Sequence, residues 1–120
     1  MAEHNDFGYE AETEAVRYLK SKGYILIERN WRFRKAEIDI IMIDKKELVV
    51  VEVKARNSNS VMEPEDAVDY SKKRLMILAA DYYVENNQIE YDVRFDVVSM
   101  LKIDNSWQIN HITDAFDAIL

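Results

Sequence analysis

The chain has 120 residues, of which 48% are hydrophobic and 32% charged, with two glycines, one proline and no cysteine. This balance predicts one globular domain over residues 1–120 and excludes linker-like and collagen-like chains. The absence of cysteine excludes a disulfide scaffold, a thiolate zinc site and a cysteine nucleophile. Met1–Glu10 lacks the basic region of a signal peptide, and no apolar run is long enough to span a bilayer, so we expect a cytoplasmic domain with no membrane contact.

The charge is distributed unevenly along the chain. Sixteen basic and 23 acidic residues give a net charge of −7, which taken alone argues against a nucleic-acid partner. Residues 29–56, however, hold eight lysines and arginines against five acids, a net charge of +3. Because salt confines each electrostatic field to about 10 Å, this segment can form a phosphate-binding face. The alternative is a solvated surface of mixed charge.

The hydrophobic pattern predicts an α/β fold in the order α-β-β-β-α-β-β-α, a central mixed β-sheet flanked by helices. Strands rich in Ile and Val are expected at Tyr24–Glu28, Glu37–Ile43, Leu48–Ala55, Tyr91–Ile103 and Trp107–Ile112. The first helix is expected from about Asn5 to Lys22, and its buried arc comprises Gly8, Ala11, Ala15, Val16 and Leu19. A second helix is expected from Pro64 to about Asn86, with a core stripe of Val68, Leu75, Leu78, Ala79 and Tyr82. Thr113–Ile119 reads as a short closing helix.

The hairpin between the second and third strands carries the most informative side chains. If its turn is Asp44–Glu47, Ile43 pairs with Leu48, and a two-residue turn gives the same register. Asp39 then lies opposite Glu52, and Glu37 lies opposite Lys54. Strand alternation places these four residues on one face, which Ile41, Ile43, Leu48 and Val50 continue. The other face is expected to hold Ile38, Ile40, Val51 and Val53.

Two carboxylates placed directly opposite each other repel, because their Cβ atoms lie about 4.5–5.5 Å apart. A shared proton, a hydrogen bond or a bound cation would relieve the repulsion. Asp39 and Glu52 offer only oxygen ligands, which suits Mg²⁺ or Mn²⁺. Lys54, on the same face, can hold a nucleophilic water or stabilise the negative charge of a transition-state phosphate. The alternative is a solvent-facing strand with cross-strand ion pairs.

Other charged residues are placed as if they faced the same site. Glu12 interrupts the buried arc of the first helix, and Lys72 interrupts the stripe of the second, so we expect both to look onto one polar pocket. The alternative is that each is a rim residue whose stem packs while its charge reaches water. The stretch Arg29–Lys35 interleaves aromatic with basic side chains that can contact phosphates, namely Arg32, Arg34 and Lys35. Its rings, Trp31 and Phe33, can equally belong to the core.

The two histidines, His4 and His111, have no partner at metal-ligand spacing, so we interpret both as structural.

Asp39, followed by Glu52-Val53-Lys54 on the next strand, resembles the D…ExK motif of the PD-(D/E)XK nuclease superfamily. Nearly the whole chain resembles the YraN family of uncharacterised bacterial proteins. The matching positions are Gly8, Glu12, Ala15, Tyr18-Leu19, Gly23-Tyr24, Asn30, Arg32, Glu37-Ile-Asp39, Val51-Glu-Val-Lys54, Arg56, Pro64, Ala67-Val68, Lys72, Leu75, Arg94-Phe-Asp-Val97, His111-Ile112 and Ala115-Phe116.

The resemblance implies a restriction-endonuclease-like core close to archaeal Holliday junction resolvases, which act on branched DNA as homodimers. It implies metal-assisted hydrolysis of a DNA phosphodiester in repair or recombination. The implied Mg²⁺ (or Mn²⁺) ligands are Asp39, Glu52, the Val53 carbonyl and Glu12, with Glu37 as an accessory carboxylate. Lys54 would orient or deprotonate the attacking water, and Lys72 and Arg56 would contact the DNA backbone near the scissile phosphate.

The sequence departs from the family pattern at two glycines, which are replaced by Ala11 and Ala36. Ala11 suits a helix better than glycine does. Ala36 would be strained if its position required a positive φ or a close approach of the substrate.

Two functions therefore remain open at this point. The first is a Mg²⁺-dependent DNA endonuclease, because every charged position of the motif is present. The second is a non-catalytic nucleic-acid-binding or adaptor domain with a nuclease-like fold, which the net charge of −7 favours. A third reading, a purely structural ion-pair hairpin, predicts no metal binding.

Overall fold

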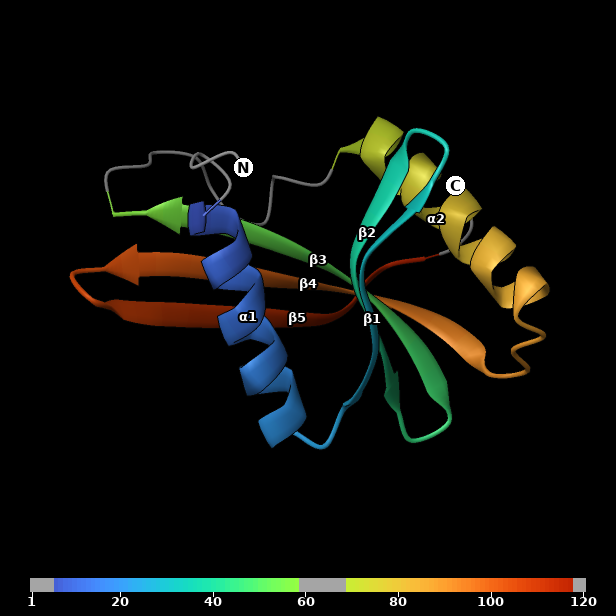
Figure 1. The fold of residues 1–120 in the computed structure, drawn as a ribbon, viewed down its shortest axis with the longest axis horizontal. Coiled ribbons are helices and arrows are strands. Elements are labelled where there is room, and N and C mark those ends of the chain that lie inside the picture. The colour runs from blue at the N-terminus through green and yellow to red at the C-terminus, as the bar shows by residue number, and fades with distance from the viewer. Residues whose placement is uncertain (1–5, 59–68, 118–120) are drawn as a thin grey trace.

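A computed structural model describes residues 6–58 and 69–117, and it confirms an α/β fold with a central mixed sheet (Figure 1). Its elements are α1 (Asp6–Ser21), β1 (Ile25–Phe33), β2 (Ala36–Asp44), β3 (Glu47–Asn57), α2 (Tyr70–Asn86), β4 (Asp92–Ile103) and β5 (Ser106–Phe116). The strands form one sheet in the order β1-β2-β3-β4-β5. Only β3 and β4 pair in parallel among these strands, and α2 lies in the crossover that a parallel pair requires. Neither helix is long and apolar enough to cross a membrane.

The two helices cover opposite faces of the sheet. Val49 and Val51 on β3 pack in one buried cluster with α1, whereas Leu48 and Val50 pack in another with α2, as the alternation of a strand dictates. Figure 1 shows α1 in front of one half of the sheet and α2 beside the hairpin of β1 and β2. The result is a three-layer α/β/α arrangement with a separate core on each side.

Helix α1 closely follows its sequence prediction. Its buried residues are Ala11, Ala15, Val16 and Leu19, while the predicted arc member Gly8 is exposed. The helix ends where Gly23 adopts a φ of 98° and its N–H bonds to the Lys20 carbonyl at 2.9 Å. Only glycine takes that conformation without steric cost, so this residue fixes the stop.

Helix α2 is oriented differently from the prediction. Asp69 caps its first turn by accepting a hydrogen bond from the Lys72 N–H at 2.9 Å; the predicted start at Pro64 and the stripe residue Val68 lie outside the described residues. The buried side chains are Met76, Ala79, Ala80 and Tyr83. The other predicted stripe members, Leu75, Leu78 and Tyr82, are 39%, 51% and 43% exposed. Both stripes are apolar, and the helix buries the one whose two alanines allow close approach to the sheet.

All strands except β4, which closely matches its prediction, are longer than the sequence pattern indicated. β1 continues beyond Glu28 through the basic and aromatic stretch to Phe33. β5 continues through Thr113–Phe116, so the closing helix predicted there is wrong over these residues; Ala118 and Ile119 lie outside the described part. Phe116 pairs with Phe95 across the sheet, and their rings stack 4.9 Å apart. This contact favours the strand over a helix.

The predicted β2–β3 register is confirmed next to the turn, but it does not hold at the far end of the hairpin. The β2–β3 pairs run from Asp44–Glu47 to Ile40–Val51 around a turn at Lys45-Lys46, and they include Ile43–Leu48. The pairing does not extend to the expected pairs Asp39–Glu52 and Glu37–Lys54. Ile38, predicted to share a face with Ile40, packs instead in the α2-side cluster. β2 therefore bends away from β3 at Asp39.

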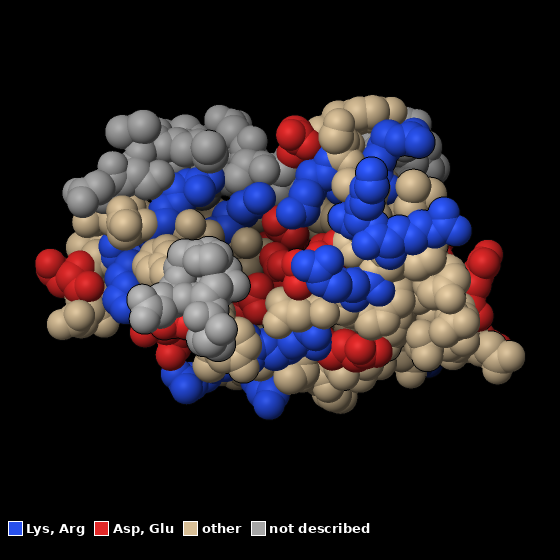
Figure 2. All heavy atoms as spheres, turned by 45° about the horizontal axis from the view of Figure 1, so that its top comes forward, with Lys and Arg blue, Asp and Glu red and all other residues tan. Residues whose placement is uncertain are grey.

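A bend in β1 accompanies the one in β2. Asn30 has a φ of 52°, a left-handed conformation that asparagine tolerates better than most residues. It lies between the pairs Arg29–Ile40 and Trp31–Ile38, so it faces Asp39 across the hairpin. The outer part of the hairpin thus turns as a unit and opens the edge of β3. Figure 2 shows the corresponding face of the molecule, where acidic side chains lie in a hollow between groups of lysines and arginines.

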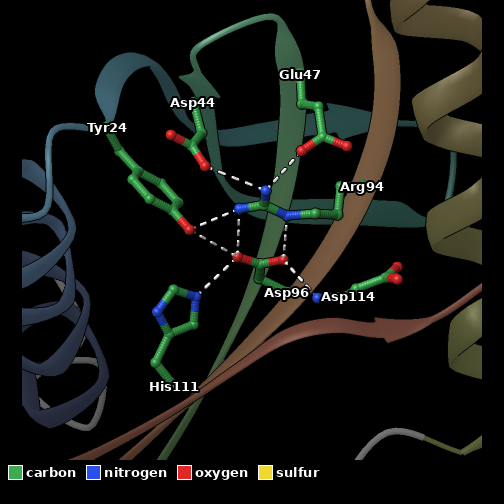
Figure 3. Close-up of polar contacts among 7 residues, drawn as sticks. All are labelled: Tyr24, Asp44, Glu47, Arg94, Asp96, His111 and Asp114. Atoms are coloured by element: carbon green, nitrogen blue, oxygen red, sulfur yellow. Dashed lines mark hydrogen bonds and ion pairs between the residues drawn. The ribbon is translucent and has the colours of Figure 1, made fainter.

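A buried polar cluster on the α1 side of the sheet joins β2, β3, β4 and β5 (Figure 3). Asp96 on β4 is fully buried and takes two bonds from the Arg94 guanidinium, at 3.0 and 3.1 Å. His111 Nε2 lies 2.7 Å from Asp96 Oδ2, and the Asp114 N–H donates to Oδ1 at 3.0 Å. Arg94 also reaches Asp44 and Glu47 at the β2–β3 turn, at 3.1 and 2.7 Å, and the Tyr24 hydroxyl at 2.6 Å. The structural interpretation of His111 agrees with this role.

Replacing Arg94 with Met should destabilise the fold by about 3–5 kcal/mol, because Asp96 would keep its buried charge after losing its main partner. The measurement is urea unfolding at neutral pH. Lys102→Met is the matched control, since the Lys102–Glu10 ion pair is more exposed and should contribute less than about 1 kcal/mol. Equal losses in the two variants would contradict the proposed importance of the cluster.

Stability should also decrease in acid through Asp96. Burial opposes its charged form, but the bonds from His111, Arg94 and the Asp114 N–H outweigh burial and lower the pKa of Asp96. Because the folded pKa lies below the unfolded value, the contribution is present above the unfolded pKa of about 3.9 and is lost as pH falls through the folded pKa.

Unfolding of the wild type and of Asp96→Asn, measured from about pH 7 to about pH 3, tests this expectation. The difference in the free energy of unfolding should be largest near neutrality and shrink in acid. A difference that stays constant over this range would contradict it.

Candidate functional site

Asp39 lies where β2 leaves β3, and its carboxylate takes over a backbone partner that the ladder would otherwise supply. Asp39 Oδ2 accepts a hydrogen bond from the Val53 N–H at 2.9 Å. The N–H and carbonyl of one strand residue face the same side of the strand, so the Val53 carbonyl faces this edge as well. The bend therefore places a carboxylate and a carbonyl oxygen beside the open edge of β3.

Glu52 is the most deeply buried charged residue of the site, with 2% exposure. Lys54 Nζ and Lys72 Nζ both lie 3.1 Å from its Oε2 atom, one from β3 and one from α2. Its other oxygen, Oε1, is buried with no hydrogen-bond partner in the described part of the chain. An unsatisfied carboxylate oxygen is costly to bury, and it marks a position where a proton or a cation would be stabilised.

Asp39 and Glu52 meet side chain to side chain even though their backbones are not paired. Burial, followed by the charge of Glu52, raises the pKa of Asp39 to about 8, against the lowering effect of the Val53 N–H. In the same contact, burial disfavours charged Lys72, but Glu52 outweighs burial and the pKa of Lys72 is raised. The two carboxyl groups therefore hold a shared proton readily, as expected for a close like-charged pair.

Glu12 approaches the pair from α1 but has partners of its own. Its carboxylate accepts hydrogen bonds from Asn30 Nδ2 at 3.0 and 3.3 Å, and Arg29 lies 3.4 Å away. Burial raises the pKa of Glu12, which Asn30 and Arg29 partly offset, and its charge in turn raises the pKa of Asp39. Glu12 is thus an electrostatic neighbour of the pair, and its predicted role as a metal ligand stays a prediction.

A pocket of about 210 Å³ opens onto Asp39. Its lining includes Glu37, Asp39 and Lys72 together with two of the predicted phosphate contacts, Arg32 and Lys35. Arg32 and Glu37 form an ion pair at 3.6 Å. Arg34 lies instead beside a neighbouring groove, and Arg56 lies on β3 two residues beyond Lys54. The structure thus brings five of the predicted residues, Arg32, Lys35, Glu37, Asp39 and Lys72, together at one opening.

Sequence reasoning missed the roles of Asn30 and Arg29 in this site and left the position of two rings, Trp31 and Phe33, open. Asn30 was matched only by resemblance, but its left-handed backbone and its bond to Glu12 make it the corner of the hairpin. Arg29 points to Glu12 and lies 4.3 Å from the Tyr9 ring, not toward the pocket. Trp31 and Phe33 pack against the α2-side core, so the core alternative holds for both rings. An asparagine followed by an aromatic residue within a strand was the available signal.

Ala36, the doubtful replacement of a glycine, fits its position. It is 5% exposed and has no positive φ, so the strain considered from the sequence does not arise.

The donor set fits a hard divalent cation. Asp39, Glu52 and the Val53 carbonyl offer oxygen atoms, and among these carboxylates Glu52 Oε1 is buried without a hydrogen-bond partner. Among residues 6–58 and 69–117, no three His, Asp or Glu side chains are close enough to form a metal cluster by themselves. An ion here would therefore rest on two carboxylates, a backbone carbonyl and water, which is the usual arrangement for Mg²⁺.

The fold and site define an α/β domain with a buried pair of carboxylates and adjacent lysines at an opened strand edge. The chain belongs to the family described as uncharacterised protein family UPF0102, whose model matches residues 11–100. It is 46% identical to a UPF0102 protein of Parabacteroides distasonis, covering 98% of both chains. It is 43% identical to one of Flavobacterium psychrophilum, over 97% of this chain and 98% of the relative. The names of these relatives assign no activity.

If the carboxylate pair binds an ion, Mg²⁺ or Mn²⁺ should raise the melting temperature. Binding that contributes about 1 kcal/mol corresponds to a rise of about 4 °C in a domain of this size. Asp39→Asn should abolish this rise, while Asp81→Asn, an exposed carboxylate on α2, should keep it. An identical metal response in Asp39→Asn and the wild type would contradict the assignment.

Asp39→Asn should also change stability without metal. An acid whose folded pKa is raised to about 8 destabilises the fold increasingly as pH rises from its unfolded pKa toward that value. The variant should therefore gain stability over the wild type as pH rises toward about 8. Melting curves in a chelating buffer across this range measure the gain, and a gain that is independent of pH would contradict the raised pKa.

Proposed function

We propose that this protein is a Mg²⁺-dependent endonuclease that hydrolyses DNA phosphodiesters, with branched DNA in repair or recombination as its substrate. The observation that carries the proposal is the Asp39–Glu52 pair. Two carboxylates meet at a bend in the sheet, two lysines contact one of them, and one buried oxygen lacks a donor among the described residues. The ion pairs with the two lysines do not reach that oxygen, which a bound cation or a proton shared with Asp39 would satisfy.

The residues would divide the chemistry between them. Asp39, Glu52 and the Val53 carbonyl would hold Mg²⁺, with Glu12 as a further carboxylate close by. When bound, the ion would neutralise phosphate charge and favour deprotonation of water. Lys54, whose side chain is 20% exposed, would orient the attacking water or, in its neutral amine form, accept the proton of that water. Lys72 would contact a phosphate oxygen.

The basic side chains at the opening supply the contact with DNA. Arg32 and Lys35 line the same pocket as Asp39, so a phosphate at the carboxylate pair would have cations on the rim. These groups act at short range, whereas salt screens most of the more distant charges that give the chain its net charge of −7. An acidic chain with only a local basic rim has few cations for long contacts along a duplex. A distorted or branched DNA site that inserts into the hollow is therefore the favoured substrate.

The second candidate is a non-catalytic nucleic-acid-binding or adaptor domain. Its supporting observation is that Glu52 Oε2 already contacts two ammonium groups, which satisfy that oxygen without an ion. In that case the basic rim would bind DNA and the carboxylates would serve only to position the lysines.

Cleavage of labelled four-way junction, flap, single-stranded and duplex DNA with Mn²⁺ or Mg²⁺ distinguishes the two candidates. We expect cleavage by the wild type, preferentially of branched substrates, and none with a chelator. Lys54→Ala should lower the rate by about 10²- to 10⁴-fold, as is typical for loss of a proton-transfer group. Asp39→Ala should abolish cleavage. Lys46→Ala, which removes an exposed lysine from the β2–β3 turn, should leave the rate unchanged.

Junction binding without cleavage under any of these conditions would favour the adaptor. Cleavage that survives in Asp39→Ala would show that the activity comes from a contaminant or from another site, and would reject the proposal.

A further inference from the structure

An apolar groove of about 580 Å³ lies next to the candidate site and has no part in the chemistry proposed above. Phe33, Leu78 and Tyr82 form its apolar surface, and we call it the aromatic groove. It shares Lys35, Ala36 and Leu75 with the pocket that opens onto Asp39, so the two adjoin. A molecule bound at the carboxylate pair can therefore extend into the aromatic groove.

The rings of the groove are arranged as a stack. The Phe33 and Tyr82 rings lie 4.2 Å apart at an angle of 20°, and the Trp31 ring is tilted by only 6° from Phe33 and 26° from Tyr82. Tyr82 nevertheless remains 43% exposed and Leu78 51% exposed. Parallel rings with an exposed member accommodate another flat ring by stacking, and every nucleobase has a suitable face.

The charges around the groove suit a nucleotide better than an aliphatic ligand. The Arg34 guanidinium lies 5.2 Å from the centre of the Phe33 ring, and Lys35 stands at the passage to the Asp39 pocket. Such cations match the phosphates on either side of a base. Glu85 also lines the groove, and a carboxylate can accept a hydrogen bond from the amino group of a base.

We infer that the aromatic groove binds an unpaired nucleobase of the DNA whose neighbouring phosphate lies at the Asp39 pocket. The inference rests on the proposed function and names its substrate class: DNA with an unpaired base beside the phosphodiester to be cleaved. A base inside a duplex is already stacked and paired, so only a base that has left the helix can enter.

Binding of an oligonucleotide with 2-aminopurine at an unpaired position tests this inference. The full chain is titrated in a chelating buffer, so that no cleavage occurs, and quenching of the fluorescent base reports stacking. Tyr82→Ala should weaken this binding by about tenfold or more, as removal of a stacking ring does elsewhere. Tyr82→Phe, which keeps the ring, should bind like the wild type. Tyr91→Ala should also bind like the wild type, since Tyr91 is similarly exposed at 41% and lies outside the groove.

A second variant covers the case in which Tyr82→Ala fails to fold, since Trp31 and Phe33 pack on that ring. Leu78→Asp changes a half-exposed side chain and places a charge in the groove, so it should weaken binding to a similar extent while leaving the melting curve near that of the wild type.

Four outcomes would overturn the inference. The first is that the wild type binds no oligonucleotide, and the second is that neither Tyr82→Ala nor Leu78→Asp weakens binding. The third is that these variants weaken binding of a fully paired duplex equally. The fourth is that the variants lose a dimer that the wild type forms in sedimentation while their base binding is unchanged. The last would identify the groove as a contact between two copies of the chain. Cleavage that depends on Asp39 but not on Tyr82 would reject the groove and keep the nuclease. Tyr82-dependent binding without cleavage would reject the nuclease and keep the aromatic groove as a base-binding site.

Discussion

The bend that separates the β1–β2 hairpin from β3 is the constraint on which the site depends. An antiparallel pair that continued past Ile40–Val51 would use the Val53 N–H and carbonyl in the ladder and would bury Asp39 against Glu52 along a regular edge. Because β2 turns away, the Val53 N–H bonds to the Asp39 carboxylate instead. The same bend opens a pocket between the hairpin and α2, into which Arg32, Lys35 and Lys72 also project. One irregularity of the backbone thus places both the carboxylate pair and the Val53 carbonyl edge beside one opening.

The two buried acidic sites of this protein obey different rules. Asp96 is fully buried, but the Arg94 guanidinium, His111 and a backbone N–H bond to it, and its pKa is lowered. Asp39 is only partly buried, yet burial and Glu52 raise its pKa to about 8. A structural carboxylate is expected to be satisfied within the fold, whereas a perturbed pair with one buried oxygen lacking a donor is a candidate functional site. This contrast supports the interpretation of Asp96 as a structural carboxylate and of Asp39 as part of a functional site.

Much of the fold could be predicted because the strands are rich in Ile and Val and polar turns separate them. The register around Lys45-Lys46 follows from two adjoining runs of Ile and Val that admit only one pairing with both faces buried. The bend at Asp39 could not be predicted, because it depends on Asn30 adopting a left-handed backbone on the neighbouring strand. Similarly, α2 carries two apolar stripes, and which one is buried depends on the fit of Ala79 and Ala80 to the sheet. The closing helix was predicted wrongly because the strand there depends on contact between Phe116 and Phe95, which are far apart in the sequence.

The stripe that α2 leaves exposed then becomes informative. Leu75, Leu78 and Tyr82 have the spacing of a core face, and a chain under no other constraint would be expected to bury them. They remain on the surface where the hairpin bend brings Phe33 beside them and where Lys35 connects them to the carboxylate pocket. An apolar surface that is bordered by cations and adjoins a polar pocket is complementary to a nucleotide, which consists of a flat ring attached to a charged phosphate. The same bend that exposes Asp39 thus also sets the aromatic groove beside it, so a base and its phosphate can be held at once.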